Sequence, residues 1–433
     1  MTAEAPTADI SKETSPAQRS LLSYLLVPRP NDLIKGLMIA VPYVVGVLGV
    51  GDLSVESVCR ALIVISVVEL LIYAARYQWN DIRGFRSDQQ HPDCAARGRL
   101  PGPLSREGSR KTTSLAVAAI RLIVVVLLAI LVSGLNLGTI LAWSVVGVFG
   151  AAFLYESLRR VATERPQDGT RALRPAVVAL WLVVGAGYAV RGLIGLGLAI
   201  DLTAYPGLVA VATVTFWAYG IAFVTSRWAV EATAFAQSHS GTIEWNASAS
   251  QAREHQIALA RWLPDDLGLS RPADDGRTAV RTWAPLSGRT SFLAPWNIAM
   301  TVAGSGAAAT GYAVAEGAIS SLTAAFAVLG AVLAFVTVIV SSRRRPISVV
   351  VGAAVIGISA VVLHVSSPVV VSLPWLLLMG AYMFFSTRTL AKLERGGPIR
   401  VSVDQVIHWS RRRRAPLPPG TEGTVDSTPP ARQ

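Results

Sequence analysis

Apolar runs of about 20 residues recur along this chain, and each is long enough to cross a bilayer as a helix. Inside a bilayer no water is available to hydrogen-bond the backbone, so each run must be helical. The sequence therefore predicts an all-α polytopic membrane protein, a bundle of nine or ten transmembrane helices in which the last two runs are the uncertain pair. The runs lie near residues 33–50, 57–79, 113–134, 138–156, 174–199, 206–226, 293–314, 320–341, 347–364 and 369–387.

Composition agrees with a membrane protein and argues against a soluble one, because 52% of the residues are hydrophobic and only 15% are charged. The formal net charge is +12. In a membrane protein such an excess marks cytoplasmic loops and their contact with anionic lipid, and we therefore expect no nucleic-acid partner. An anionic substrate at the same face would also exploit the positive charge. The two cysteines, Cys59 and Cys94, provide no disulfide framework.

The distribution of arginine predicts the orientation. The loops after the second, fourth, sixth and eighth runs are basic, whereas residues 51–56 and 201–205 contain no Lys or Arg. The positive-inside rule then places the basic loops and the N-terminus in the cytoplasm. Ten spans would also keep the basic residues 411–414 cytoplasmic, and nine spans would place them outside. We expect a multi-pass protein of a bacterial plasma membrane.

Three regions follow from this pattern. Residues 1–28 are predicted to be a flexible cytoplasmic tail, and residues 29–390 a transmembrane helical domain. Residues 391–433 form a basic, Pro-rich C-terminal tail. The domain contains a long cytoplasmic loop at 227–291, which is either an amphipathic cover at the membrane surface or a disordered insertion.

A polar stretch at residues 77–92 follows the second apolar run. Its Asn80, Asp81 and Asp88 are oxygen ligands of the kind that Mg²⁺ prefers. On a helix Asp81 and Asp88 share one face, roughly 10 Å apart along the axis. That distance suits two ions bridged by a diphosphate, or one ion and a separate polar contact. A solvated helix end with two acids is the simpler alternative.

Ionisable residues also occur inside the apolar runs, where they usually face the bundle interior or a water-filled cavity. In the second run they form one helical stripe: Glu69, Tyr73, Arg76, Tyr77 and Asn80. The stripe either lines a cavity that opens at Asn80 or pairs Glu69 with an interior arginine. Lys35 lies near the cytoplasmic end of its run and could snorkel to the surface. Arg121 and Arg191 lie deeper, and Arg191 could pair with Glu69 or with an anionic substrate.

Residues 80–92 resemble the first aspartate-rich motif of the UbiA prenyltransferase superfamily, Asn-Asp-x-x-Asp-x-x-x-Asp. Asn80, Asp81 and Asp88 match this motif, but Gly84 replaces the middle aspartate. The following His91-Pro92, and Arg191 between Gly187 and Gly195, are similar to the decaprenyl-phosphate phosphoribosyltransferase branch. The second aspartate motif of the family would fall near Leu180, where no acid stands.

The resemblance implies a UbiA-like bundle and a transferase of alkyl or aryl (prenyl) groups, which moves a prenyl group from an isoprenoid diphosphate to an acceptor. It implies Asn80, Asp81 and Asp88 as catalytic residues and Mg²⁺ bound by Asp81 and Asp88. Its partners would be an isoprenoid phosphate or diphosphate and the bilayer. Substrate binding is predicted for Lys35, Tyr77, Arg97, Tyr155, Arg159, Arg160 and Arg191. Two alternatives stay open: phosphoribosyl transfer onto a polyprenyl phosphate, and a degenerate, non-catalytic lipid-binding protein.

Overall fold

The computed structural model describes residues 19–50, 53–91, 94, 98–163, 173–232, 235–239, 242–245, 253–263, 291–341 and 344–386. Within these ranges, nine helical segments are long and apolar enough to cross a membrane, which confirms the predicted all-α membrane bundle. Helices α3 and α4 form one of these segments, and α8 and α9 form another. The helices are α2 (Leu37–Val50), α3 (Val55–Val67), α4 (Tyr73–Gln89), α6 (Glu107–Leu131), α7 (Leu137–Thr163), α8 (Pro175–Val183), α9 (Ala186–Gly197), α10 (Pro206–Ala232), α13 (Pro295–Glu316), α14 (Ser321–Ile339) and α15 (Arg345–Val362).

A further apolar helix, α16 (Pro368–Ser386), packs against α13 and α15. Its fully buried Trp375 lies in the same apolar core as Met300 of α13. The apolar segment of α16 is shorter than those of the nine candidate spans. The predicted pair of last runs therefore forms two helices, α15 and α16, and among the described residues only α15 counts as a candidate span.

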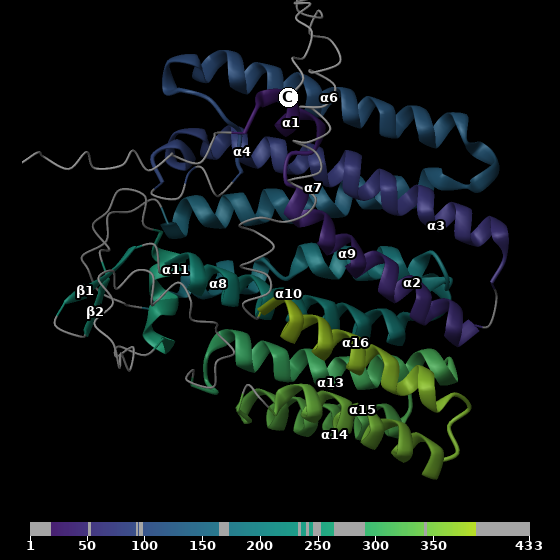
Figure 1. The fold of residues 1–433 in the computed structure, drawn as a ribbon. Helices are drawn as coiled ribbons and strands as arrows, with labels where there is room; N and C mark the ends of the chain where they lie inside the picture. Colours follow the sequence, from purple (N-terminus) through teal and green to yellow (C-terminus); the bar gives the residue numbers. More distant parts are fainter. Residues whose placement is uncertain are drawn as a thin grey trace, which may run out of the picture.

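The helices run side by side, so the chain forms one elongated bundle (Figure 1). The N-terminal helices α2, α3, α4, α6, α7 and α9 share one apolar core, built around residues such as Ile39, Val64 and Leu141. Helices α10 and α13 to α16 share a second core around Met300 and Trp375. Contacts of α2 and α9 with α10 and α13 join the two halves.

Local sequence signals explain where several helices begin and end. Ser54 caps α3, and Ser320 forms a capping box with Thr323 at the start of α14. Proline occupies the first turn of α8, α13 and α15, where its missing N–H costs no helical hydrogen bond. Helix α13 ends at Gly317, whose φ of 65° is easily reached only by glycine.

Part of the segment predicted to be an N-terminal tail is helical. Residues 19–28 belong to the bundle, because α1 (Leu21–Leu26) is hydrogen-bonded to α4 and α6. The 3-10 helix η1 (Pro30–Gly36) follows and contacts α2. Tyr24 is fully buried. Arg19 donates to the carbonyl oxygens of Ser23 (2.6 Å) and Pro28 (2.9 Å), which closes the end of α1. Residues 19–28 therefore pack on the bundle, and the rest of the predicted tail, residues 1–18, lies outside the described residues.

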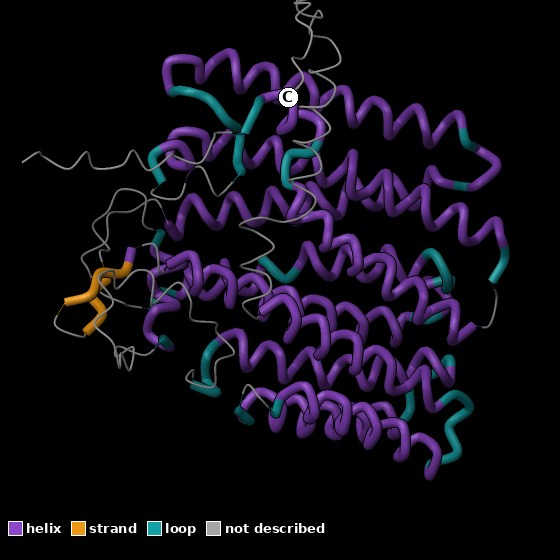
Figure 2. Tube along the Cα trace, viewed as in Figure 1, coloured by secondary structure: helices purple, strands orange, loops and turns teal. Residues whose placement is uncertain are grey.

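The predicted loop at 227–291 contains structure that composition had only partly indicated. Helix α10 continues to Ala232, and β1 (Ala236–His239) pairs antiparallel with β2 (Thr242–Trp245). Figure 2 shows this hairpin at one end of the bundle. The segment formed by α11 (Glu254–Ile257) and η7 (Ala258–Trp262) is buried against α8 and α10. Residues 253–263 therefore pack on the bundle, whereas a cover at the membrane surface stays a prediction, and the hairpin was not predicted.

Candidate functional site

The candidate site is built on α4 and the π-helical turn before it. The turn spans Val68–Ile72 and therefore includes Glu69. It shifts the helical phase of the segment from Val55 to Gln89, so side chains before and after the turn do not follow one regular α-helical period. Such turns often occur at functional sites. After it α4 continues to Gln89, which places Asn80, Asp81 and Asp88 on the helix, as their spacing required.

Glu69 and Arg191 form a buried ion pair between α9 and the π turn. Arg191 Nε lies 2.7 Å from Glu69 Oε1, and Arg191 Nη2 lies 3.2 Å from Glu69 Oε2. The same Nη2 donates to the Tyr77 hydroxyl at 3.3 Å, and the guanidinium carbon lies 3.3 Å from the ring centroid of Tyr73. Of the two predicted partners for Arg191, the structure therefore provides Glu69.

Only one of the two glycines that flank Arg191 is required by packing. A Cβ atom at Gly195 would lie 2.2 Å from the carbonyl oxygen of Ile39, so this glycine lets α9 approach the backbone of α2. Nothing lies within 4 Å of a Cβ atom at Gly187, so space does not require glycine there.

Four cations surround Tyr77. The guanidinium carbons of Arg29 and Arg76 lie 4.7 Å and 5.3 Å from its ring centroid, and Lys35 Nζ lies 5.9 Å away. The fourth, Arg191, binds its hydroxyl. We call these five side chains the Tyr77 cluster.

The cations of the Tyr77 cluster differ in their acidic partners. Asp32 pairs with Lys35 (2.7 Å) and Arg29 (3.8 Å). Arg76 makes no ion pair within the described residues. Lys35 is therefore held by an acid near the start of η1, and only Arg76 stands without a carboxylate.

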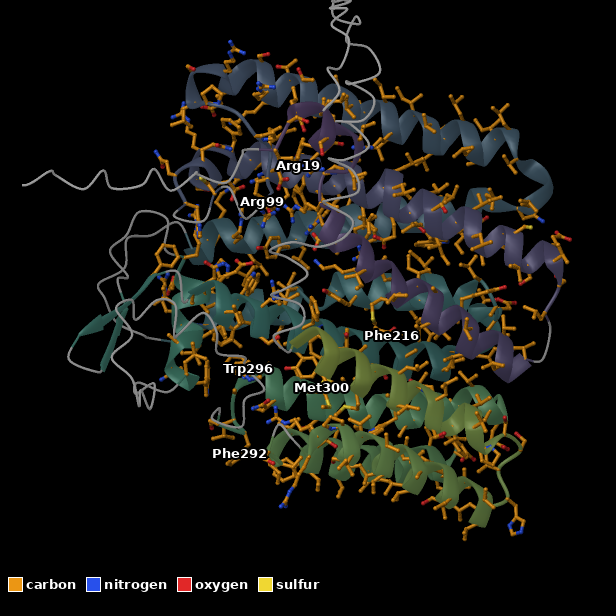
Figure 3. The ribbon with its side chains drawn as sticks, viewed as in Figure 1. Arg19, Arg99, Phe216, Phe292, Trp296 and Met300 are labelled. Carbon is orange, nitrogen blue, oxygen red and sulfur yellow. The ribbon has the colours of Figure 1, made fainter. Side chains whose placement is uncertain are left out.

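Asp81 lies beside this cluster, and both of its carboxylate oxygens are engaged. Arg29 and Arg99 donate to Oδ1, the latter at 3.2 Å, and the Tyr24 hydroxyl donates to Oδ2 at 3.2 Å. Asp81 is 1% exposed. Figure 3 shows Arg99 and Arg19 near α1 and α4.

Two of the groups that lie outside the spans, Tyr24 and Arg29, have shifted pKa values that favour these hydrogen bonds to Asp81. Burial, and then the charge of Asp81, raise the pKa of Tyr24, so its hydroxyl keeps the proton that it donates. Burial alone would lower the pKa of Arg29, but Asp81 and Asp32 raise it above its ordinary value. Arg29 is therefore charged at any physiological pH.

A second polar network joins Asn80 to α7. We assign the Asn80 amide the orientation in which its nitrogen donates to Glu156 Oε1 (2.7 Å) and its oxygen accepts from Arg29 Nη2 (2.9 Å). Glu156 is buried, and its Oε2 lies 2.7 Å from Arg159 Nη2 and 3.7 Å from Arg83 Nε. Glu156 was not among the predicted site residues. An acid near the end of an apolar run was the signal that could have identified it.

The other predicted site residues on α4 and α7 lie outside the Tyr77 cluster. The Tyr155 ring stacks on Trp228 (6.2 Å between centroids) and lies 5.9 Å from the Arg159 guanidinium carbon. Asp88 lies further along α4, within electrostatic range of Arg159. Arg160 is exposed and makes no ion pair in the described part of the chain, and its substrate contact stays a prediction. Arg97 lies outside the described residues.

Sequence reasoning missed the residues that pair with the motif. Tyr24 comes from the segment that was expected to be a tail, Arg29 is the first residue of the predicted transmembrane domain, and Arg99 comes from the basic loop after α4. Arg121 is another such link, because it donates to Gln78 and to the carbonyl oxygens of Leu25 (2.6 Å) and Leu26 (2.8 Å). Arg121 thereby attaches α1 to α4 and α6.

The described residues do not fit the predicted Mg²⁺ site. Mg²⁺ needs oxygen ligands that are free to coordinate it, but those of Asp81 already accept hydrogen bonds from two arginines and a tyrosine. Across the described ranges, no three His, Cys, Asp or Glu side chains come together as a possible metal site. The position expected for the second motif holds Leu180, which is fully buried beside Trp181.

A small pocket adjoins the Tyr77 cluster. Its polar lining comes from Arg29, Glu69 and Tyr77, and its apolar lining includes Leu33 and Leu70. The pocket therefore combines a charged wall with the apolar sides of membrane helices.

Comparison with known proteins does not identify the chain: no protein-family model, curated protein or solved structure matches it. The resemblance to the UbiA superfamily therefore rests on the motif residues named above. What the site does is argued below from its charges and contacts.

Proposed function

We propose that this protein is an intramembrane transferase that takes an isoprenoid diphosphate and moves its prenyl group to an acceptor. The observation that supports this proposal is the set of cations around Tyr77 within a bundle of apolar helices. A diphosphate head would lie against Arg29, Arg76 and Lys35. The prenyl tail would lie against the apolar side chains of the helices, in an environment as apolar as the lipid interior.

In such a reaction the bond between the allylic carbon and the diphosphate oxygen breaks, and the acceptor forms its bond to that carbon. Negative charge then develops on the leaving diphosphate. Fixed cationic donors in a site of low dielectric constant stabilise that charge strongly. Arg29 is suited to this role, because Asp81 and Asp32 hold its guanidinium in position beside Tyr77.

A non-catalytic lipid-binding protein is the second candidate, and one observation favours it. Gly84 and Leu180 stand at the two positions where the resemblance predicts further acids. Phosphoribosyl transfer onto a polyprenyl phosphate, the other alternative, would use the same cations for a different leaving diphosphate. The three functions differ in their products.

A lipid-product assay separates them. The purified full chain is incubated with membranes and either labelled prenyl diphosphate or labelled phosphoribosyl diphosphate with polyprenyl phosphate. We expect a prenylated lipid product from the first donor. Arg76→Gln should lower its rate about 10- to 100-fold, the value of one charge-assisted hydrogen bond. The control is Arg86→Gln, whose side chain is 77% exposed on the same helix. Product from the phosphoribosyl donor alone, or from neither donor, refutes the proposal.

A further inference from the structure

The carboxylate of Asp81 serves as a counter-charge for arginines. Arg29 and Arg99 both donate to its Oδ1, and Tyr24 donates to Oδ2. A divalent cation at this carboxylate would have to displace the two guanidinium groups and then lie close to them. Like charges at such distances repel strongly in a buried site. The contacts of Asp81 therefore oppose a metal ion at this position.

The two positions that could add acidic ligands do not supply them. A Cβ atom at residue 84 would lie 3.0 Å from Asp88 Oδ2, so the carboxylate of Asp88 lies against the bare backbone of Gly84. Leu180 is fully buried in an apolar cluster with Val177, Trp181 and Leu259. The last of these belongs to the segment 253–263, which covers this end of the bundle.

What the site lacks is an acceptor. Arg29 Nε is buried and has no hydrogen-bond partner among the described residues, and Arg76 has no acidic partner there. Both groups are donors. A buried donor left unpaired costs about 1–3 kcal/mol. An anion can accept hydrogen bonds from these donors and remove that cost, whereas a cation cannot.

Positive charge also exceeds negative charge in the connected networks. The carboxylates are Asp32, Glu69, Asp81, Asp88 and Glu156, and the more numerous cations are Arg29, Lys35, Arg76, Arg83, Arg99, Arg159 and Arg191. Guanidinium groups remain charged at all relevant pH values and match phosphate oxygens with a planar fork of donors.

We propose that Arg29, Arg76 and Arg99 replace a divalent cation in this protein, so that the site binds the diphosphate of an isoprenoid lipid without metal. Asp81 is then a positioning residue that holds Arg29 and Arg99 in place. The identity of the lipid rests on the proposed function. The metal-free mode of binding rests on the contacts of Asp81 and on the unpaired donors.

Farnesyl diphosphate binding to the full chain in nanodiscs tests this proposal, measured once in excess EDTA and once in excess Mg²⁺. We expect the two dissociation constants to agree within about threefold, a difference of well under 1.4 kcal/mol. Arg76→Gln should weaken binding about 10- to 100-fold in both buffers. Arg99→Gln, at a side chain that is 19% exposed, is the second variant, and Arg86→Gln is the control.

Asp81→Asn gives the sharpest distinction, because the two roles of Asp81 predict opposite signs. Loss of a metal ligand would abolish binding of the diphosphate. Asparagine keeps an oxygen that can accept hydrogen bonds from Arg29 and Arg99, and it removes the charge that repels the diphosphate, so we expect binding no weaker than that of the parent protein. The unfolding temperature of each variant is measured in parallel, so that lost binding is not mistaken for lost structure.

Three results would overturn the proposal in different ways. Binding that requires Mg²⁺ and is abolished by Asp81→Asn refutes the metal-free mode and leaves the proposed function intact. Absence of farnesyl diphosphate binding in both buffers refutes the proposed function itself. Inorganic diphosphate binding as tightly as farnesyl diphosphate shows that the cluster binds free diphosphate, and not the head of a lipid.

Discussion

Removing either member of the Glu69–Arg191 pair should destabilise the bundle, whereas removing both should be milder. The side chains are 6% and 3% exposed. Two hydrogen bonds of 2.7 Å and 3.2 Å join them. In Glu69→Gln the guanidinium of Arg191 loses its counter-charge, and in Arg191→Gln the carboxylate of Glu69 does.

The magnitude follows from the burial of both charges. Breaking a buried ion pair by removing one partner typically costs about 3–5 kcal/mol, because the other charge stays buried and unpaired. We expect each single variant to lose that much free energy of unfolding. The double variant Glu69→Gln/Arg191→Gln leaves no buried charge, so its loss should fall short of the sum by at least about 2 kcal/mol.

Reversible unfolding of the purified protein in mixed micelles, titrated with sodium dodecyl sulfate, measures these differences. Glu56→Gln is the matched control, since Glu56 is exposed in the first turn of the same membrane span. It should change the free energy of unfolding by no more than about 1 kcal/mol, the value of a helix-terminal charge. Single losses that add fully in the double variant would refute the reasoning. If Arg191→Gln is as stable as the parent protein but no longer binds diphosphate, the result would support the alternative in which Arg191 contacts an anionic substrate.

Gly195→Ala should cost about 1–3 kcal/mol or more in the same assay, because its new methyl group meets the backbone of α2. Gly187→Ala should be neutral or stabilising by up to about 1 kcal/mol, and equal losses would contradict the packing argument. His255 lies outside the spans, and its burial, then the charges of neighbouring arginines, lower its pKa well below the usual value. The unfolded chain then binds the proton first, so stability should fall by about 1.4 kcal/mol per unit as pH drops below about 6.5. Thermal unfolding of His255→Gln should show a shallower fall, and an unchanged slope would exclude His255 as the cause. Cysteines placed at Ser105 and Leu53 in a cysteine-free chain test the topology: an impermeant reagent outside intact cells should label only residue 53, and labelling at 105 would reverse the orientation.

The sequence by itself determined the class of fold and the helix that carries the motif. A run of apolar residues in a bilayer can satisfy its backbone only as a helix, so the bundle follows from hydropathy alone. The period of a helix also determines which residues of one segment share a face. For that reason the stripe from Tyr73 to Asn80 and the placement of Asp81 and Asp88 on α4 could be predicted without coordinates, whereas the π turn that shifts Glu69 could not.

The partners of those residues were decided only by the tertiary structure. Arg29 and Tyr24 reach Asp81 from more than fifty positions away in the sequence, and Arg191 reaches Glu69 across 122 positions. Helical periodicity gives the direction of a side chain from its own helix, but not which neighbouring helix it meets. That choice depends on how whole helices pack, and packing here gave the motif aspartate two arginines and a tyrosine.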